Sequence, residues 1–281
     1  GLYIQAGDIA NSGVEMSLAY NDKIGAVDFE SRLVYSRNVN KVKKLVHNYK
    51  TGIDNQVINF TETSAGGGYI REGDSMGDVY ITKVLKRDAT GAIAVAADGS
   101  LSSMDLPNGE RLRIGNTNPD FTLGWRNNIS WKGLNLSFLI NARVGGIVTS
   151  ETQAVLDQFG VSKATAEARD RGYVEVAGGQ RVDPQKYYEV VANQQLLGYY
   201  YYSATNIRLQ NVSLTYTLPK TLLGQGWPGI TVGFIANNLW MIYNKAPFDP
   251  EIAASTGTYG QGSDYFSAPS LRNIGFSLKL N

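Results

Sequence analysis

Apolar and polar residues alternate along much of this chain with a period of two, which is the pattern of a β-strand with one apolar face. The last segment shows the pattern clearly, with one face formed by Ile274, Phe276, Leu278 and Leu280. The same alternation fills 121–131 and 134–144, on either side of the short turn Lys132-Gly133. It predicts a hairpin of two strands of about 11 residues each, long enough for a tilted strand to cross a lipid bilayer.

Other segments alternate in the same way. Further strands are predicted over 13–21, 25–37, 204–217 and 229–242, with a weaker one over 79–86. Within 204–217 the apolar positions change face between Leu209 and Val212. We expect a β-bulge near Gln210-Asn211, because a bulge adds one unpaired residue to a strand and shifts the alternation.

Short and long connections alternate along the chain. Turns are predicted at 22–24, 132–133 and 218–228, and long polar connections at 38–119, 146–203 and 243–269. This arrangement is typical of an outer-membrane β-barrel, which has short periplasmic turns and long extracellular loops. The last strand then runs toward the periplasm, and the long connections share the opposite end. Residues 151–170 have helical spacing and predict one short helix on a loop.

The composition fits a barrel better than an ordinary soluble domain. Charged residues make up 18% of the 281 residues, below the roughly 25% of soluble domains. Glycine and tyrosine are abundant, with 31 and 17 residues, and the net charge of +1 gives no sign of a nucleic-acid partner. Cysteine is absent and His47 is the single histidine. The sequence therefore offers no metal site of the thiolate or histidine-cluster type, and no cofactor is predicted.

Three features favour a membrane barrel over a soluble β-sandwich, which stays open as an alternative. The strands exceed the roughly five to six residues usual in soluble proteins. Aromatic residues lie near strand ends, as in interfacial girdles: Tyr20, Tyr35, Trp131, Tyr216, Trp240 and Tyr243. Charged residues within strands fall on the polar face, where they would line a wet lumen: Glu15, Arg126, Arg143, Arg208 and Lys279. Because open sheet edges are not tolerated in lipid, we expect further strands from a longer polypeptide or from another chain.

Five short motifs, in order, resemble those of one family of outer-membrane proteins. They are Asn11-Ser12-Gly13-Val14-Glu15, residues 114–121, residues 207–212 with 216–219, Asn237-Asn238-Leu239 with Phe248-Asp249-Pro250-Glu251, and the closing strand 269–281. On these motifs, which cover nearly the whole chain, it resembles the C-terminal barrel portion of the SusC/RagA family of TonB-linked outer-membrane proteins. It departs from that family in stopping at Asn281, where the family's closing strand ends in an aromatic residue.

The resemblance implies an all-β fold, in which the chain supplies seven to nine strands of a larger antiparallel transmembrane barrel of about 22 strands, with long extracellular loops. Residues 1–281 would form its C-terminal part, with the plug and the first strands outside this chain. The resemblance further implies TonB-dependent import, across the outer membrane, of a large nutrient such as an oligosaccharide or, alternatively, an oligopeptide. No enzymatic activity is expected, because no bond is made or broken.

The same resemblance implies several partners. They are a SusD-like surface lipoprotein, TonB through the missing N-terminal part, the rest of the barrel and the plug, and outer-membrane lipid. Two other functions stay open. A surface β domain that binds glycans through its Tyr-rich loops would be soluble without detergent, and a passive porin would lack a plug and a TonB-contacting segment upstream of Gly1.

The candidate ligand-binding residues are aromatic side chains of the long connections. They are Tyr187, Tyr188, Tyr199, Tyr201, Tyr259, Tyr265 and Phe266. Their faces could stack on sugar rings or pack against a partner. For the run 199–202 the alternative is an aromatic girdle at the membrane interface, and for the other aromatic residues it is an ordinary surface loop.

The remaining candidates are polar. The lumen-facing cations could bind an anionic substrate or could simply line a hydrated wall. The family-motif positions are Asn238, Asp249, Pro250 and Glu251. Asp249 and Glu251 could suggest acid–base chemistry or Ca²⁺ binding. Pro250 between them and the lack of a further partner at readable spacing instead favour a structural loop.

Overall fold

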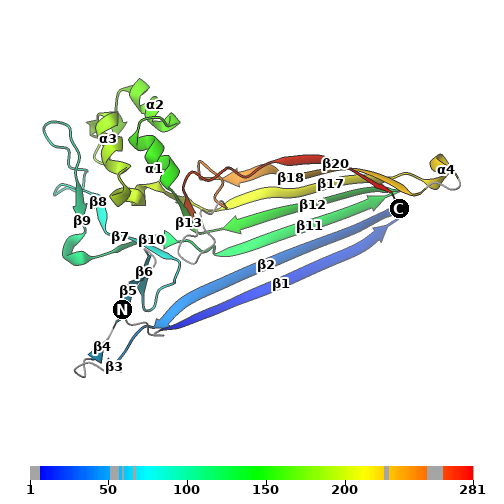
Figure 1. Cartoon of the computed structure of the whole chain (residues 1–281), viewed down its shortest axis with the longest axis horizontal. Helices are drawn as coiled ribbons and strands as arrows, with labels where there is room; N and C mark the ends of the chain where they lie inside the picture. The colour runs from blue at the N-terminus through cyan, green and yellow to red at the C-terminus, as the bar shows by residue number, and fades with distance from the viewer. Residues whose placement is uncertain are drawn as a thin grey trace.

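The computed structural model describes residues 7–50, 57–58, 60–65, 68–224, 228–251 and 262–280. Seven strands form one sheet, in which every neighbouring pair is antiparallel. In order across the sheet they are β1 (Asp8–Ile24), β2 (Val27–Lys44), β11 (Phe121–Trp131), β12 (Leu134–Val144), β17 (Asn206–Thr217), β18 (Ile230–Asn244) and β20 (Asn273–Leu280). Figure 1 shows these strands side by side, with most of the other elements gathered at one end.

The predicted strands of this sheet are confirmed, although one turn lies elsewhere and β2 continues to Lys44, into the connection that was expected to begin at residue 38. The first turn was expected at 22–24, but β1 runs on to Ile24 and the chain turns at Gly25, where φ is +62°. Glycine adopts such a φ at no steric cost, which places the turn there. The second turn is as predicted: φ is +46° at Lys132 and +88° at Gly133, and a type I′ hairpin requires both to be positive.

The predicted β-bulge is also present in β17. The register passes from Leu209 directly to Asn211 in the pairing with β12 and with β18, so Gln210 has no ladder partner on either side. One extra residue shifts the alternation by one position. As a result, Val212 lies on the same face of the sheet as Leu209.

The register gives the sheet one apolar and one polar face. One cross-strand row on the apolar face consists of Phe29, Ile129, Leu136, Leu214, Phe234 and Phe276. The adjacent row on the polar face consists of Asp28, Ser130, Asn135, Thr215, Gly233 and Ser277. On the apolar face, Phe276 is 88% exposed and Leu278 is 68% exposed. A soluble sandwich would bury this face against a second sheet, whereas here it is open, as expected of a barrel wall.

The long connections fold together into a unit at one end of the sheet, called here the loop cap (residues 78–116, 146–204 and 262–264). Its elements are β7 (Asp78–Ile81), β8 (Lys83–Leu85), β9 (Ser103–Asp105), η1 (Pro107–Gly109), β10 (Leu112–Asn116), β13 (Ile147–Ser150), α1 (Glu151–Gln158), α2 (Lys163–Arg171), β14 (Val174–Glu175), β15 (Arg181–Val182), α3 (Pro184–Val191), η2 (Gln194–Tyr200), β16 (Tyr201–Ser203) and β19 (Ser263–Asp264). The weak strand predicted over 79–86 is thus two strands, β7 and β8, which pair with β10 and β9 in separate sheets.

The loop cap has a hydrophobic core of its own. It is formed by Leu85, Ile93, Leu101, Ala154, Val176, Val182, Val191, Ala192, Leu196 and Tyr200. These residues come from the first and the second long connection, which lie far apart in the sequence. The second connection also pairs with the last one, because β13 runs parallel to β19. The prediction that 146–203 and 243–269 share one end is therefore confirmed.

The helix content of the loop cap differs from the prediction. The single helix expected over 151–170 is two helices, each with a serine N-cap: Ser150 accepts from the amide of Gln153, and Ser162 from that of Thr165. Gly160, with φ of +67°, lies in the connection between them. The helix α3, capped by Asp183, was not predicted. No helix of the described residues is long and apolar enough to span a bilayer.

The remaining elements are small. Two hairpins, β3 (Tyr49–Lys50) with β4 (Val57–Ile58) and β5 (Glu62–Ala65) with β6 (Gly68–Arg71), belong to the first long connection. The short helix α4 (Lys220–Leu223) lies in the 218–228 connection. Figure 1 shows α4 at the end of the sheet opposite to the loop cap. This is the position expected for a short turn at the opposite end of the strands.

Candidate functional site

An arginine clamp joins the last long connection to the sheet. Arg208 in β17 is only 4% exposed. Its Nη1 and Nη2 atoms donate to Oδ2 and Oδ1 of Asp249, at 3.2 and 2.6 Å. Asp249 also accepts from Oγ of Ser270 at 2.5 Å and from the amide of Glu251 at 3.0 Å. Such a bidentate pair fixes geometry as well as charge.

The protonation of Asp249 follows from this setting. Burial raises the pKa of its carboxyl group, but the hydrogen bonds from Arg208 and Ser270 outweigh burial and hold the pKa below its usual value. Glu251 lies on the same guanidinium, with its Oε2 3.4 Å from Nη2 of Arg208. Both carboxylates of the Asp249-Pro250-Glu251 motif are therefore engaged by one arginine. This favours a structural role for the motif over acid–base chemistry.

Asn238, the other motif position, lies in β18 opposite the bulge. Its φ is +50°, a conformation that asparagine tolerates better than most residues. Its Nδ2 donates to the carbonyl oxygen of Leu271 at 3.2 Å, just before β20. The residue therefore combines a backbone requirement at the bulge with a contact to the closing segment.

The five charged residues predicted to line a lumen share the polar face of the sheet. Glu15 belongs to one cross-strand row with Ser36, Thr122 and Arg143. Arg143 is half-buried and donates to the carbonyl oxygen of Thr117 at 2.7 Å, while Glu15, Arg126 and Lys279 are exposed. The sheet thus places them on one face, but Arg208 is occupied by Asp249 and is not free to bind an anion.

A second polar junction ties the first long connection to the top of β2. Asp78 is 8% exposed and accepts from Nη2 of Arg113 and Nδ2 of Asn116, both at 2.7 Å. Nearby, Oδ1 of Asn40 accepts from the amide of Met76 at 2.7 Å. These contacts border a polar cavity of about 490 Å³ next to the end of the sheet.

The aromatic candidates divide by burial. Tyr200 is 3% exposed, lies in the core of the loop cap and donates to Asp157 at 3.0 Å, so a girdle role does not hold for it. Tyr199 is 40% exposed, and its hydroxyl accepts from the amide of Leu85 at 3.4 Å. Tyr201 is partly buried in β16.

The other aromatic candidates form two pairs. Tyr187 and Tyr188 in α3 make an edge contact with ring centroids 5.1 Å apart. Burial raises the pKa of Tyr187 to about 12, which keeps its hydroxyl protonated at neutral pH. Tyr265 and Phe266 form a similar pair at 5.2 Å and are each 56% exposed. Tyr259 lies outside the described residues.

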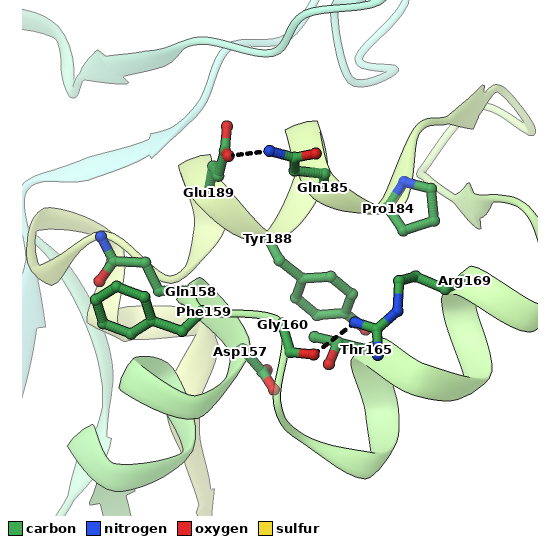
Figure 2. Close-up of a pocket in the computed structure, with 10 residues that line it drawn as sticks. All are labelled: Asp157, Gln158, Phe159, Gly160, Thr165, Arg169, Pro184, Gln185, Tyr188 and Glu189. Carbon is green, nitrogen blue, oxygen red and sulfur yellow. Dashed lines mark hydrogen bonds between the residues drawn. The ribbon is translucent and has the colours of Figure 1, made fainter.

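A cavity of about 230 Å³ lies between the three helices of the loop cap. It is lined by Asp157, Gln158, Phe159, Gly160, Thr165, Arg169, Pro184, Gln185, Tyr188 and Glu189. Figure 2 shows the ring of Tyr188 projecting from α3 toward the residues that join α1 to α2. Sequence reasoning found only Tyr188 of this set, because the cavity depends on how three helices pack. The serine and aspartate N-caps could have revealed the helices but not their arrangement.

The polar groups of the cavity are held in place by internal contacts. Asp157 is 5% exposed and accepts from Nε2 of Gln153 at 2.7 Å and from the hydroxyl of Tyr200 at 3.0 Å. Nη1 of Arg169 donates to the carbonyl oxygen of Gly160 at 2.5 Å, and Nε2 of Gln185 donates to Glu189 at 2.7 Å. The cavity is therefore lined by hydrogen-bonded polar side chains, and these include both positively and negatively charged groups.

Comparison with known proteins relates the chain to a TonB-dependent receptor. It is 26% identical over 302 residues to "TonB-dependent receptor P3" of Formosa agariphila (strain DSM 15362 / KCTC 12365 / LMG 23005 / KMM 3901 / M-2Alg 35-1), a match that covers 98% of the chain and 29% of the relative. No protein-family model matches it.

Solved structures give the fold. A structure of the RagAB peptide importer in the closed-closed state matches with a TM-score of 0.66 and 18% identity, and covers 97% of this chain and 29% of that one. A structure of the RagAB peptide transporter matches with a TM-score of 0.65 and 19% identity over 97% of this chain and 29% of its own. The chain spans less than a third of the length of each of these relatives.

The fold and the sequence comparison together define the class. The chain is an antiparallel β-sheet with a folded loop cap, and its fold is similar to part of the RagAB structures. The resemblance drawn from the motifs is confirmed: the chain is similar over nearly its whole length to part of a TonB-dependent receptor.

Proposed function

We propose that this chain forms the C-terminal part of an outer-membrane barrel that imports a large nutrient in a TonB-dependent manner. The single observation that carries the proposal is the seven-stranded sheet with one open apolar face and one polar face, whose long connections gather at one end. An apolar face suits lipid, and a polar face suits a hydrated lumen. In this role the chain supplies wall, lumen lining and extracellular loops, and it performs no covalent chemistry.

The folded loop cap is an argument for a partner protein on the outer surface. The loops of a passive pore do not need a hydrophobic core. Here two long connections share a hydrophobic core. A unit of this kind can present a fixed surface to a surface lipoprotein of the SusD type. A solved structure with this fold is described as the RagAB peptide importer. TonB would act through parts of the protein outside this chain, in concert with the plug and the remaining strands.

The proposed nutrient is an oligosaccharide, and an oligopeptide is the alternative. The exposed ring pair of Tyr265 and Phe266 and the aromatic lining of the cavity at Tyr188 supply flat apolar surfaces for sugar rings. The alternative has its own support, because the solved structures with this fold are described as peptide importers.

Uptake in whole cells tests the proposal. Fluorescently labelled oligosaccharides and oligopeptides are supplied to cells that produce the intact protein, with and without TonB. We expect uptake of one of these classes to stop when TonB is removed, while binding of the label at the cell surface persists. Uptake that continues without TonB indicates a passive porin instead. Recovery of the protein in the aqueous fraction without detergent indicates a soluble binding module.

Copurification tests the partner. The intact protein is isolated in detergent, and the surface lipoprotein is sought by mass spectrometry in the same complex. A second variant removes the exposed aromatic pair next to the loop cap by Tyr265→Ser with Phe266→Ser, which leaves the core of the cap untouched. Isolation of the protein alone under conditions that retain its lipid would contradict this part of the proposal.

A further inference from the structure

The cavity between α1, α2 and α3 has the features of a ligand site rather than of a packing defect. One of its lining residues is Asp157, which is 5% exposed and carries a carboxylate. A carboxylate can accept about four hydrogen bonds, and the side chains of Gln153 and Tyr200 occupy two of these positions. The carboxylate therefore keeps acceptor capacity for further donors, and Asp157 is one of the residues that line the cavity of about 230 Å³.

The walls of the cavity combine aromatic and amide groups. Phe159 follows α1 and is 74% exposed, although a phenyl ring in water is unfavourable. The ring of Tyr188 comes from α3 on another side (Figure 2). Gln158 and Gln185 are exposed at the rim, and each amide offers both a donor and an acceptor. This set can contact the apolar face of a ring and the hydroxyl groups around its edge at the same time.

The charges of the cavity do not favour a ligand that carries charge of a single sign. Arg169 lies on one wall and opposes a cation, while Asp157 and Glu189 oppose an anion. A neutral ligand avoids both repulsions. The volume of about 230 Å³ is below the roughly 300–1,000 Å³ of sites for drug-sized ligands. One small ring fits such a space, and a longer chain would continue into solvent.

We propose that this cavity binds one ring of a neutral sugar, with Asp157 accepting from its hydroxyl groups and Phe159 and Tyr188 contacting its apolar face. The site is in the loop cap and is separate from the polar face of the sheet. The inference deepens the proposed function, on which it rests, by assigning a place in the loop cap where a neutral sugar ring binds. In this assignment the cavity captures a glycan before it enters the lumen.

Ligand binding to the intact protein tests the inference without transport. The protein is purified in lauryldimethylamine oxide, because detergents with sugar headgroups would compete for the site. Methyl glucoside, galactoside and mannoside, the corresponding glucuronide, and uncharged, lysine and glutamate tripeptides are compared by saturation-transfer NMR and calorimetry. We expect at least one neutral glycoside to bind, and the glucuronide to bind at least about tenfold more weakly because of Asp157 and Glu189.

Two surface variants and a matched control assign the site. Phe159→Ala and Gln185→Ala change exposed side chains that line the cavity, so folding of the cap is retained. Each is expected to weaken binding by about five- to tenfold, which is the range for loss of one stacking contact or one hydrogen bond. Val161→Ala changes a nearby side chain that is 67% exposed and does not line the cavity, and binding should not change.

The outcomes separate this inference from the proposed function. If no neutral glycoside binds, if both cavity variants bind as the unmodified protein does, or if a tripeptide binds in place of the sugar, the sugar site is wrong. TonB-dependent uptake of a nutrient can still be observed in each of these cases. If uptake does not need TonB, the import proposal fails, and binding in detergent still reports on the cavity by itself.

Discussion

The guanidinium group of Arg208 in β17 holds both carboxylate oxygens of Asp249, a residue 41 positions later in the chain. The side chains are only 5% and 9% exposed. This contact ties the connection that follows β18 back to the polar face of the sheet, close to the bulge at Gln210. It explains why an Asp-Pro-Glu motif and an arginine-containing motif occur together in this chain.

Removal of one partner from this pair should destabilise the loop end of the barrel. Asp249→Ala removes the bidentate partner of a buried guanidinium group and leaves it only the more distant and more exposed Glu251. We expect a loss of about 3 kcal/mol in unfolding free energy. Unfolding in detergent, followed by tryptophan fluorescence, measures it. Arg126→Ala, on the same face but exposed, is the control and should change stability by less than about 0.5 kcal/mol. Equal effects of the two variants would contradict the clamp.

The clamp should also be sensitive to acid. Because the pKa of Asp249 is lowered in the folded protein from its ordinary value of 3.8, its contribution to stability is complete above that value. It is lost as the pH falls through the lower folded pKa. We expect the melting temperature to fall below about pH 4 more steeply for the unmodified protein than for Asp249→Asn. Parallel pH profiles of the two proteins would show that Asp249 does not contribute.

The apolar face of β20 should reject charge. Phe276→Arg places a cation on the face assigned to lipid, at a cost of roughly 2–4 kcal/mol near the bilayer midplane. Ser277→Arg puts the same side chain on the polar face, one residue later, and should be tolerated. The fraction of protein that assembles in the outer membrane, read from heat-modifiable mobility, compares them. Equal assembly of the two variants would contradict the assignment of this face to lipid.

The loop cap should unfold without the sheet. Leu196 is 2% exposed in the core of the cap, and Leu196→Ala should cost about 2–5 kcal/mol of local stability. Limited proteolysis of intact outer membranes is expected to cut within 146–204 in this variant. The barrel should keep the heat-modifiable electrophoretic mobility of the folded protein. Leu222→Ala, a 73% exposed leucine in α4, provides the control. Protection equal to that of the unmodified protein would show that the cap has no cooperative core.

The sequence by itself determined the strands, their faces and the alternation of short and long connections. These follow from local rules: a period of two assigns Phe276 and Leu278 to one face and Ser277 and Lys279 to the other whatever surrounds them. Even the bulge at Gln210 could be inferred, because a change of face within one strand requires an extra residue. The motif at Asp249 was recognised as structural, but its partner was not.

Only the tertiary structure decided what the long connections do. The pairing of Arg208 with Asp249, the core that unites Leu85 with Leu196, and the cavity around Asp157 and Tyr188 all join residues that are distant in sequence. No periodicity marks such contacts, since each depends on the path of the intervening chain. Local patterning fixes which face of a strand is apolar, whereas burial in a loop is fixed by the partners that fold against it.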